Sequence, residues 1–198
     1  MRKVTPFLIG LITVGAAITG LLVLVEATLY TPTNAAGAPT VLPNTYPTRL
    51  IIPSLLINAN VQHVGLNAAG NIRTPDNFTD VAWYTGSAVP GRPGVALIDG
   101  HVDNGLGLAG VFKHLNTIKV GDAVDVLTNK GVTVHFVVTN IAAYNYQDVP
   151  MAMILGGAGT SAAVTTPTLR LITCDGTWVP GQLTYNERLV VTAKLVQN

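Results

Sequence analysis

From residue 48 onward, apolar and polar positions alternate over short stretches, which Gly, Pro, Asn and Asp separate. In 132–138 every second side chain is apolar, and 189–195 repeats this pattern. Side chains of a strand point alternately to its two faces, so both stretches predict strands with one buried face. We also expect strands at 49–52, 59–64, 95–98, 123–127 and 169–173, and short helices at 106–115 and 151–155. About seven to eight short strands with few helices predict a mostly-β fold, closed or nearly closed into a barrel.

A long apolar stretch precedes these strands. The segment Phe7 to Val25 contains no charged residue, and a helix of this length spans roughly 28 Å at about 1.5 Å per residue. This matches the hydrocarbon core of a bilayer, so we expect one transmembrane helix at 7–25. A cleavable signal peptide is the alternative, but the cleavage-like Ala36-Gly37-Ala38 lies too far beyond the apolar run. Arg2 and Lys3 predict a cytoplasmic N-terminus at 1–6, a single-pass anchor in the cell membrane and an extracellular domain.

Composition changes again between the apolar stretch and the strands. Residues 26–47 contain four prolines among Thr, Ala, Gly and Asn, which predicts a semi-extended linker before a single domain at 48–198. The chain has 11 Lys and Arg and 10 Asp and Glu. Without Arg2, Lys3 and Glu26 the two signs balance. A formally neutral domain lacks the basic surface that nucleic acids require, so we expect no nucleic-acid partner.

The single cysteine of the chain, Cys174, cannot form a disulfide within the chain. Strand alternation places Cys174 on one face with Arg170 and Ile172, opposite Leu169 and Leu171. A cysteine that only filled the core would share the face of the leucines. Its position therefore favours a functional thiol.

A thiol nucleophile needs a proton partner, because free cysteine is only a few per cent thiolate near neutral pH. Three of the four histidines, His63, His114 and His135, lie in contexts typical of ordinary strand or helix positions. His101 instead follows the apolar run 95–98 within a Gly- and Asp-rich segment. A rigid strand that delivers a histidine into such a loop is typical of catalytic groups. The His and Cys spacings fit no metal-ligand motif, and we expect neither a metal nor another cofactor.

The order of these features resembles the sortases, which are cysteine transpeptidases of bacterial surfaces. The resemblance runs from about Thr48 to the C-terminus and is greatest to class F, followed by classes E and D. The matching segments are Ala82-Trp83-Tyr84, Pro90-Gly91-Arg92-Pro93-Gly94, Gly100-His101-Val102-Asp103, Val111-Phe112, Gly121-Asp122, Leu171-Ile172-Thr173-Cys174 and Arg188. Arg170 departs from the family pattern, which has Thr at that position.

This resemblance implies a sortase-type β-barrel with Cys174, His101 and Arg188 as catalytic residues. Such an enzyme would cleave a Leu-Pro-x-Thr-Gly-type sorting signal between Thr and Gly through a thioacyl intermediate on Cys174. The acyl group would pass to an amine of a cell-wall peptide or a pilin. Asp103 and Asn104 could orient His101. Candidates for substrate binding are Thr173, Asp103 and Asn104.

Two other classes of cysteine enzyme act on cell-wall peptides, but the sequence lacks their patterns. L,D-transpeptidases carry a Ser-His-Gly-Cys run, which is absent here. Papain-like hydrolases place the cysteine before the histidine, whereas His101 precedes Cys174. The remaining alternative is a membrane-tethered extracellular β-domain that binds a partner without catalysis.

The sequence does not assign a role to two further features, Asp175 and a segment of the linker. Asp175 follows Cys174, and a neighbouring carboxylate raises the pKa of a thiol. The linker segment Leu42-Pro43-Asn44-Thr45 matches the first four positions of a sorting signal, with Tyr46 in place of Gly. This match is either a chance occurrence or a pseudo-substrate that folds back and lowers activity.

Overall fold

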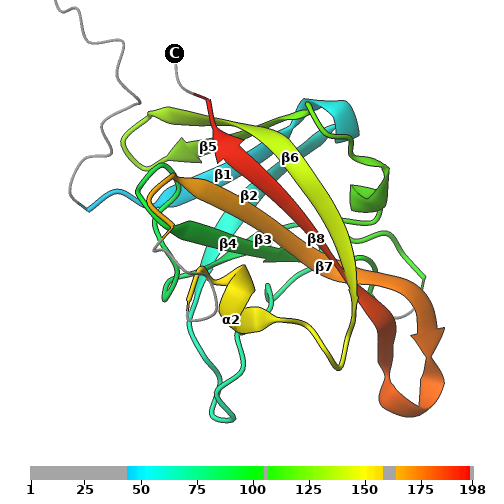
Figure 1. Ribbon diagram of the computed structural model, residues 1–198. Helices are drawn as coiled ribbons and strands as arrows, with labels where there is room; N and C mark the ends of the chain where they lie inside the picture. Colours follow the sequence, from blue (N-terminus) through cyan, green and yellow to red (C-terminus); the bar gives the residue numbers. More distant parts are fainter. Residues whose placement is uncertain (1–43, 105–106, 158–163, 197–198) are drawn as a thin grey trace, which may run out of the picture. The chain divides into compact units, whose positions relative to one another are not determined.

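A closed barrel of eight strands forms the part of the chain that the computed structural model describes, residues 44–104, 107–157 and 164–196 (Figure 1). The strands are β1 (Pro47–Ile52), β2 (Ile57–Val64), β3 (Val81–Tyr84), β4 (Val95–Gly100), β5 (Ala123–Thr128), β6 (Thr133–Asn145), β7 (Thr168–Val179) and β8 (Thr184–Leu195). Around the barrel they follow the order β1-β2-β3-β4-β7-β8-β6-β5, and β5 pairs with β1 to close it. The expected mostly-β barrel is confirmed.

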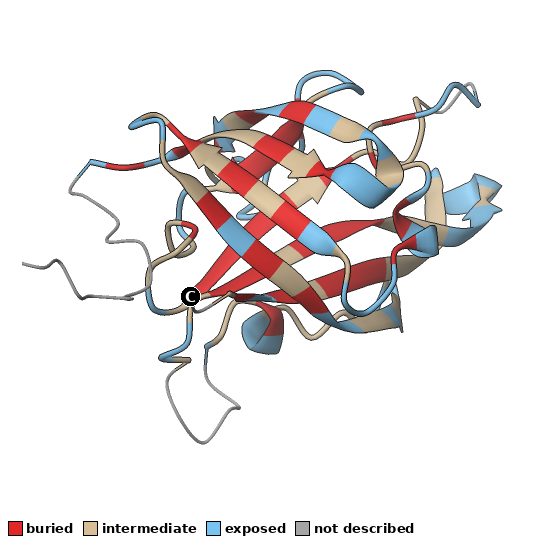
Figure 2. Ribbon diagram, turned by 90° about the horizontal axis from the view of Figure 1, so that it is seen from above, coloured by how far each residue is buried: buried red, intermediate tan, exposed pale blue. Residues whose placement is uncertain are grey.

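Alternation along the strands fills the barrel interior. In β7, Leu169 and Leu171 are fully buried in the central core, and in β8 Val191 and Ala193 lie in the same core. Figure 2 shows this alternation as bands of buried and less buried residues along the strands. The predicted division of β7 into a leucine face and a cysteine face is therefore confirmed.

A second apolar cluster lies on the outer face of the barrel. Leu97 of β4, Ile172 of β7 and Val190 of β8 pack there against Ile154 of the short helix α2 (Met151–Ile154). Figure 1 shows α2 lying against this side of the sheet. Because α2 covers the outer face only in part, the sheet beside it can form one wall of a groove.

Strand directions define two rims of the barrel. The pairs β2–β3 and β4–β7 are parallel, whereas the other neighbours are antiparallel. As a result, β1, β4 and β7 run in the same direction. They begin at one rim, which we call the entry rim, and run toward the opposite rim. Since β8 runs against β7, it returns to the entry rim.

The sequence prediction fails at two elements. The four-residue strand β3 was not expected as a strand, because a short buried run gives too little alternation to recognise. A helix was expected at 106–115, but among the described residues of this segment only turns and a bridge occur, and a short 3-10 helix follows at Leu115–Thr117. Gly110 and Phe112 instead donate backbone hydrogen bonds to Val102 and His101. This segment therefore packs along the end of β4 rather than coiling.

The expected membrane helix at 7–25 and most of the linker lie outside the described residues. Among the residues that are described, no helix is both long enough and apolar enough to cross a membrane.

Candidate active site

The parallel pairing of β4 and β7 brings His101 to the level of Cys174. Asp99 lies opposite Ile172 in this pairing. One step further, the Thr173 hydroxyl donates a hydrogen bond of 2.7 Å to the Gly100 carbonyl. His101 follows β4 at the point where Cys174 follows Thr173 on β7. Two residues that are far apart in the sequence are thus held side by side by a sheet.

Antiparallel pairing brings the third predicted residue to the same place. Cys174 of β7 and Arg188 of β8 lie directly opposite each other. Side chains of such a pair project from the same face of the sheet. The structure therefore gathers Cys174, His101 and Arg188 on the outer face at the end of β4.

The three residues line one pocket with a volume of about 210 Å³. The pocket extends from Cys174 toward α2, and its wall on that side is mostly apolar. Its other lining residues are Ile72, Thr74, Ala82, Tyr84, Leu97, Asp99, Gly100, Met151, Ile172 and Thr173. Such a pocket, apolar with a few converging polar groups, is typical of a binding site for a peptide or small ligand.

The imidazole of His101 is fixed on two sides. Its Nε2 lies 3.0 Å from the Pro75 carbonyl oxygen, and its ring centroid is 4.9 Å from that of Phe78. A carbonyl oxygen only accepts, so Nε2 must carry the proton of this hydrogen bond. The nitrogen that remains to exchange a proton with a substrate is Nδ1.

Cys174 is a free thiol that is partly buried in the pocket. Burial raises the pKa of the thiol, and the charges of Asp99 and Asp103 raise it further. The positive charge of Arg188 and a hydrogen bond from the Thr184 side chain act in the opposite direction. The fraction of Cys174 that is ionised at neutral pH therefore depends on Arg188 and Thr184.

Arg188 is held by its own hairpin. Its Nη1 donates to the carbonyl oxygens of Tyr185 and Glu187, at 3.0 and 2.8 Å, and its Nη2 donates to the Thr184 hydroxyl at 2.9 Å. The Tyr146 ring lies 5.8 Å from the guanidinium carbon. Among the described residues these hydrogen bonds use at most three of the five N–H donors of a guanidinium. The others are available to a bound substrate.

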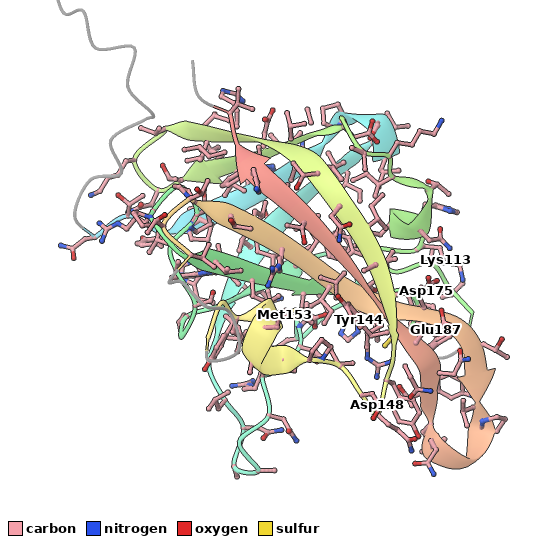
Figure 3. The ribbon with its side chains drawn as sticks, viewed as in Figure 1. Lys113, Tyr144, Asp148, Met153, Asp175 and Glu187 are labelled. Carbon is pink, nitrogen blue, oxygen red and sulfur yellow. The ribbon has the colours of Figure 1, made fainter. Side chains whose placement is uncertain are left out.

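Asp175 does not face the thiol, although it directly follows Cys174 in the sequence. It lies one residue beyond Cys174 and therefore on the other face of β7, opposite Glu187 of β8. Figure 3 shows Asp175 and Glu187 close together where the hairpin leaves the barrel. The carboxylates that act on the Cys174 pKa are instead Asp99 and Asp103.

The remaining candidate residues mainly brace the loops around the pocket. The Thr173 side chain, 3% exposed, is used in its bond to Gly100. Asp103 accepts a hydrogen bond from the Tyr185 hydroxyl, which ties the loop after β4 to the hairpin. The Asn104 side chain accepts from the Leu108 backbone N–H at 3.0 Å. Arg170, the departure from the family pattern, donates to the Met153 carbonyl and so ties β7 to α2.

Sequence reasoning missed two residues of the site, Asp99 and Thr184. Asp99 lines the pocket, and burial raises its pKa from 3.8 to about 6. Its place two residues before His101 on a strand could have indicated that both side chains share a face. Thr184 follows a loop of Gly and Pro residues, and no periodic pattern indicates where its side chain points.

The described part of the linker contradicts the pseudo-substrate hypothesis. Asn44 and Tyr46 bind Asn129 through backbone and side-chain hydrogen bonds of 3.0 to 3.3 Å, and Thr45 is only 7% exposed. These residues precede β1 and lie at the entry rim, whereas Cys174 lies toward the opposite rim. Thr45 cannot occupy the position of a scissile threonine while it is buried there.

No three His, Cys, Asp or Glu side chains within the described ranges come close enough together to hold a metal ion. The pocket brings together a thiol, an imidazole and a guanidinium. These three groups in one groove of a closed barrel are typical of a cysteine-dependent enzyme.

The chain belongs to the sortase family of cysteine transpeptidases, because the family model for the sortase domain matches residues 50–196. No curated protein sequence matches the chain. Solved sortase structures share the fold. Sortase C-1 from Actinomyces oris is 23% identical, with 75% of this chain and 72% of that chain covered and a TM-score of 0.57. The SrtA sortase from Actinomyces oris is 18% identical, with 81% and 84% covered and a TM-score of 0.56.

A lid mutant of sortase A from Corynebacterium diphtheriae is 22% identical, with 76% of this chain and 69% of that chain covered and a TM-score of 0.56. At these identities the structures show a shared fold, while family membership rests on the domain match. The assignment to class F stays a prediction.

Proposed function

We propose that this sortase cleaves a Leu-Pro-x-Thr-Gly-type sorting signal between Thr and Gly and joins the threonine carbonyl to an amine of a cell-wall peptide or a pilin. The observation that carries the proposal is the shared pocket, in which Cys174 lies opposite Arg188 and beside His101. The apolar wall toward α2, which includes Leu97 and Ile172, suits the Leu-Pro part of such a signal.

In the first half-reaction the Cys174 thiolate attacks the threonine carbonyl carbon and forms a tetrahedral oxyanion. Arg188 donates to this oxyanion through its remaining N–H groups, and one such donor is typically worth about 100- to 1,000-fold in rate. The carbon–nitrogen bond to Gly then breaks, and protonated His101 gives its Nδ1 proton to the departing amine. The product is a thioester on Cys174.

In the second half-reaction the acceptor amine attacks the thioester carbon. His101, now neutral, takes a proton from the attacking amine, and the carbon–sulfur bond breaks to return the Cys174 thiolate. The new peptide or isopeptide bond therefore forms without another energy source. We further propose that residues 7–25 anchor the enzyme in the cell membrane, with its N-terminus in the cytoplasm and the barrel outside.

The proposal is tested by incubating the full-length chain in mild detergent with Leu-x-x-Thr-Gly peptides and several amines, followed by mass spectrometry. We expect a thioester on Cys174 and a product in which an amine replaces Gly. Cys174→Ala should form no product. His101→Ala should lose about 100- to 10,000-fold in kcat/KM, and Arg188→Ala about 100-fold or more. His114→Ala is the matched control, since His114 is exposed and does not line the pocket.

Two outcomes would contradict the proposed function. Turnover by Cys174→Ala would exclude a thioester mechanism. Binding of peptides to the wild-type chain without cleavage or thioester formation would favour the non-catalytic β-domain instead.

A further inference from the structure

The loop between β2 and β3 supplies both of the ring contacts described above for His101. Nε2 of His101 donates to the Pro75 carbonyl at 3.0 Å, and the ring centroid of Phe78 lies 4.9 Å from that of the imidazole. Of these two contacts only the hydrogen bond distinguishes one ring nitrogen from the other. The position of the Pro75 carbonyl therefore decides that Nδ1 is the nitrogen left to exchange protons with a substrate.

The peptide group that accepts this hydrogen bond is held from its other side by β2. The peptide bond between Pro75 and Asp76 is trans, so the Pro75 carbonyl and the Asp76 N–H point in opposite directions. The Asp76 N–H donates to Oε1 of Gln62, a residue of β2, at 3.0 Å. The Gln62 amide, this one peptide group and the His101 ring therefore form a continuous hydrogen-bonded chain.

The orientation of the Gln62 amide follows from its partners. Its Nε2 donates to Oδ2 of Asp80 at 3.0 Å. A carboxylate only accepts, so the NH₂ end of the amide must face Asp80. The carbonyl end is then left for the Asp76 N–H, which only donates. Both partners select the same orientation, and the amide cannot reverse without losing both hydrogen bonds.

The Asp80 carboxylate that anchors Gln62 is itself braced. The side-chain amides of Asn77 and Asn60 also donate to it, at 2.8 and 3.3 Å. The hydrogen bonds from Asn77, Gln62 and Asn60 lower the pKa of Asp80, so the carboxylate is ionised at neutral pH. The Gln62 amide is therefore bound to a charged group that three side chains hold in place.

We propose that Gln62 is a positioning residue for His101: its amide holds the peptide group between Pro75 and Asp76 in the orientation that leaves Nδ1 of the imidazole to the substrate. This inference deepens the proposed function and rests on it. Hydrogen bonds in such a chain polarise one another, so the bond at the Asp76 N–H makes the Pro75 carbonyl a better acceptor for His101. Gln62 does not line the pocket and therefore acts through this peptide group.

The contribution of Gln62 should depend on the leaving group of the substrate. In the proposed first half-reaction His101 protonates the departing amine of Gly. An amine leaves only with a proton, whereas the oxygen of an ester leaves far more readily without one. A sorting peptide with an ester oxygen in place of the Gly nitrogen therefore needs less from His101. A substitution that only disturbed the fold or the groove would slow both peptides alike.

The decisive measurement is the single-turnover rate of thioester formation on Cys174, followed by mass spectrometry, for Gln62→Met with the amide and the ester peptide. Methionine has nearly the length of glutamine and makes neither hydrogen bond. On the amide peptide we expect the rate at saturation to fall about 10- to 100-fold, with the half-saturating peptide concentration changed less than about twofold. On the ester peptide we expect a fall of less than about threefold.

The matched control is Gln182→Met, because Gln182 is exposed and does not line the pocket. It should equal the wild type on both peptides. When Gln62→Met is combined with His101→Ala, it should cause no loss beyond that of His101→Ala alone.

The inference is overturned if Gln62→Met slows both peptides equally or neither of them, or if its loss adds fully to that of His101→Ala. Circular dichroism and the urea midpoint show whether each variant is folded. Should the methionine variant unfold, Gln62→Thr provides the same test, since a β-branched side chain suits a strand and threonine is too short to reach Asp76. Failure here leaves the proposed function intact as long as the wild-type chain forms the thioester. Failure of the proposed function would instead appear as a wild-type chain that forms none.

Discussion

At the scale of single residues, Asp99 is the least expected feature of the pocket. Its carboxyl lies on the outer face of β4, close to the charges of His101 and Arg188. Burial nevertheless dominates, and it raises the pKa of Asp99 to about 6. The folded protein therefore holds an ionised carboxylate at neutral pH in a place that disfavours its charge. An ionised group held where burial disfavours its charge is typical of a functional site.

Because burial of the Asp99 charge is unfavourable, we expect Asp99→Asn to stabilise the barrel at pH 8. The folded pKa of Asp99 is higher than its unfolded value of 3.8, so the stability that it contributes is present below pH 3.8 and is lost as the pH rises through 6. A shift of about two units limits the gain of the asparagine variant to about 3 kcal/mol. The measurement is urea unfolding of both proteins at pH 8 and at pH 4.

We expect the difference in unfolding free energy to be positive at pH 8 and close to zero at pH 4. Because ionised Asp99 also raises the pKa of Cys174, the asparagine variant should be alkylated at lower pH than the wild type. An equal effect of the substitution on stability at both pH values would show that the charge of Asp99 is not its cause.

The sequence identifies some residues of the site better than others, for physical reasons. Cys174 could be predicted because strand alternation separates it from the leucines of β7, and His101 because a buried strand ends just before it. Thr184 could not, because no periodic pattern indicates that its side chain accepts a hydrogen bond from Arg188.

At the scale of elements, the loop after β4 determines where His101 lies. Phe112 donates a backbone hydrogen bond to the His101 carbonyl at 2.9 Å, and Gly110 bonds to Val102 in the same way. A Cβ atom at Gly110 would collide with the carbonyl group of His101. A helix at 106–115 was predicted wrongly because apolar spacing alone does not show that this segment packs against backbone.

This packing predicts that Gly110→Ala displaces His101. A displacement of about 1 Å at a catalytic group can cost about 100-fold in rate, so we expect kcat to fall at least tenfold. Gly65→Ala is the matched control, because a Cβ there meets no atom within 4 Å. The measurement is kcat for both variants on the same sorting peptide.

A double-mutant comparison shows whether Gly110 acts through His101. If it does, Gly110→Ala combined with His101→Ala should be no slower than His101→Ala alone. Additive losses would mean that the glycine supports some other part of the pocket.

At the scale of the whole barrel, the described start of the chain is separated from the pocket by the length of the strands. Asn44 and Tyr46 are held by Asn129 at the entry rim. Thr45, the last residue of the signal-like segment, is therefore held away from Cys174 while these contacts persist. We expect the double substitution of Leu42 and Pro43 by Ala to leave kcat/KM on a short sorting peptide unchanged. A rise of threefold or more would restore the pseudo-substrate hypothesis.

The same arrangement has a practical consequence for anyone who uses the enzyme as a ligation reagent. The strand that opens the barrel starts at the entry rim, and β8 finishes there at Leu195 (Figure 1). A resin, dye or fusion partner coupled to either end of the barrel would sit on the far side from the groove. Immobilised enzyme should therefore accept bulky protein substrates as readily as free enzyme does.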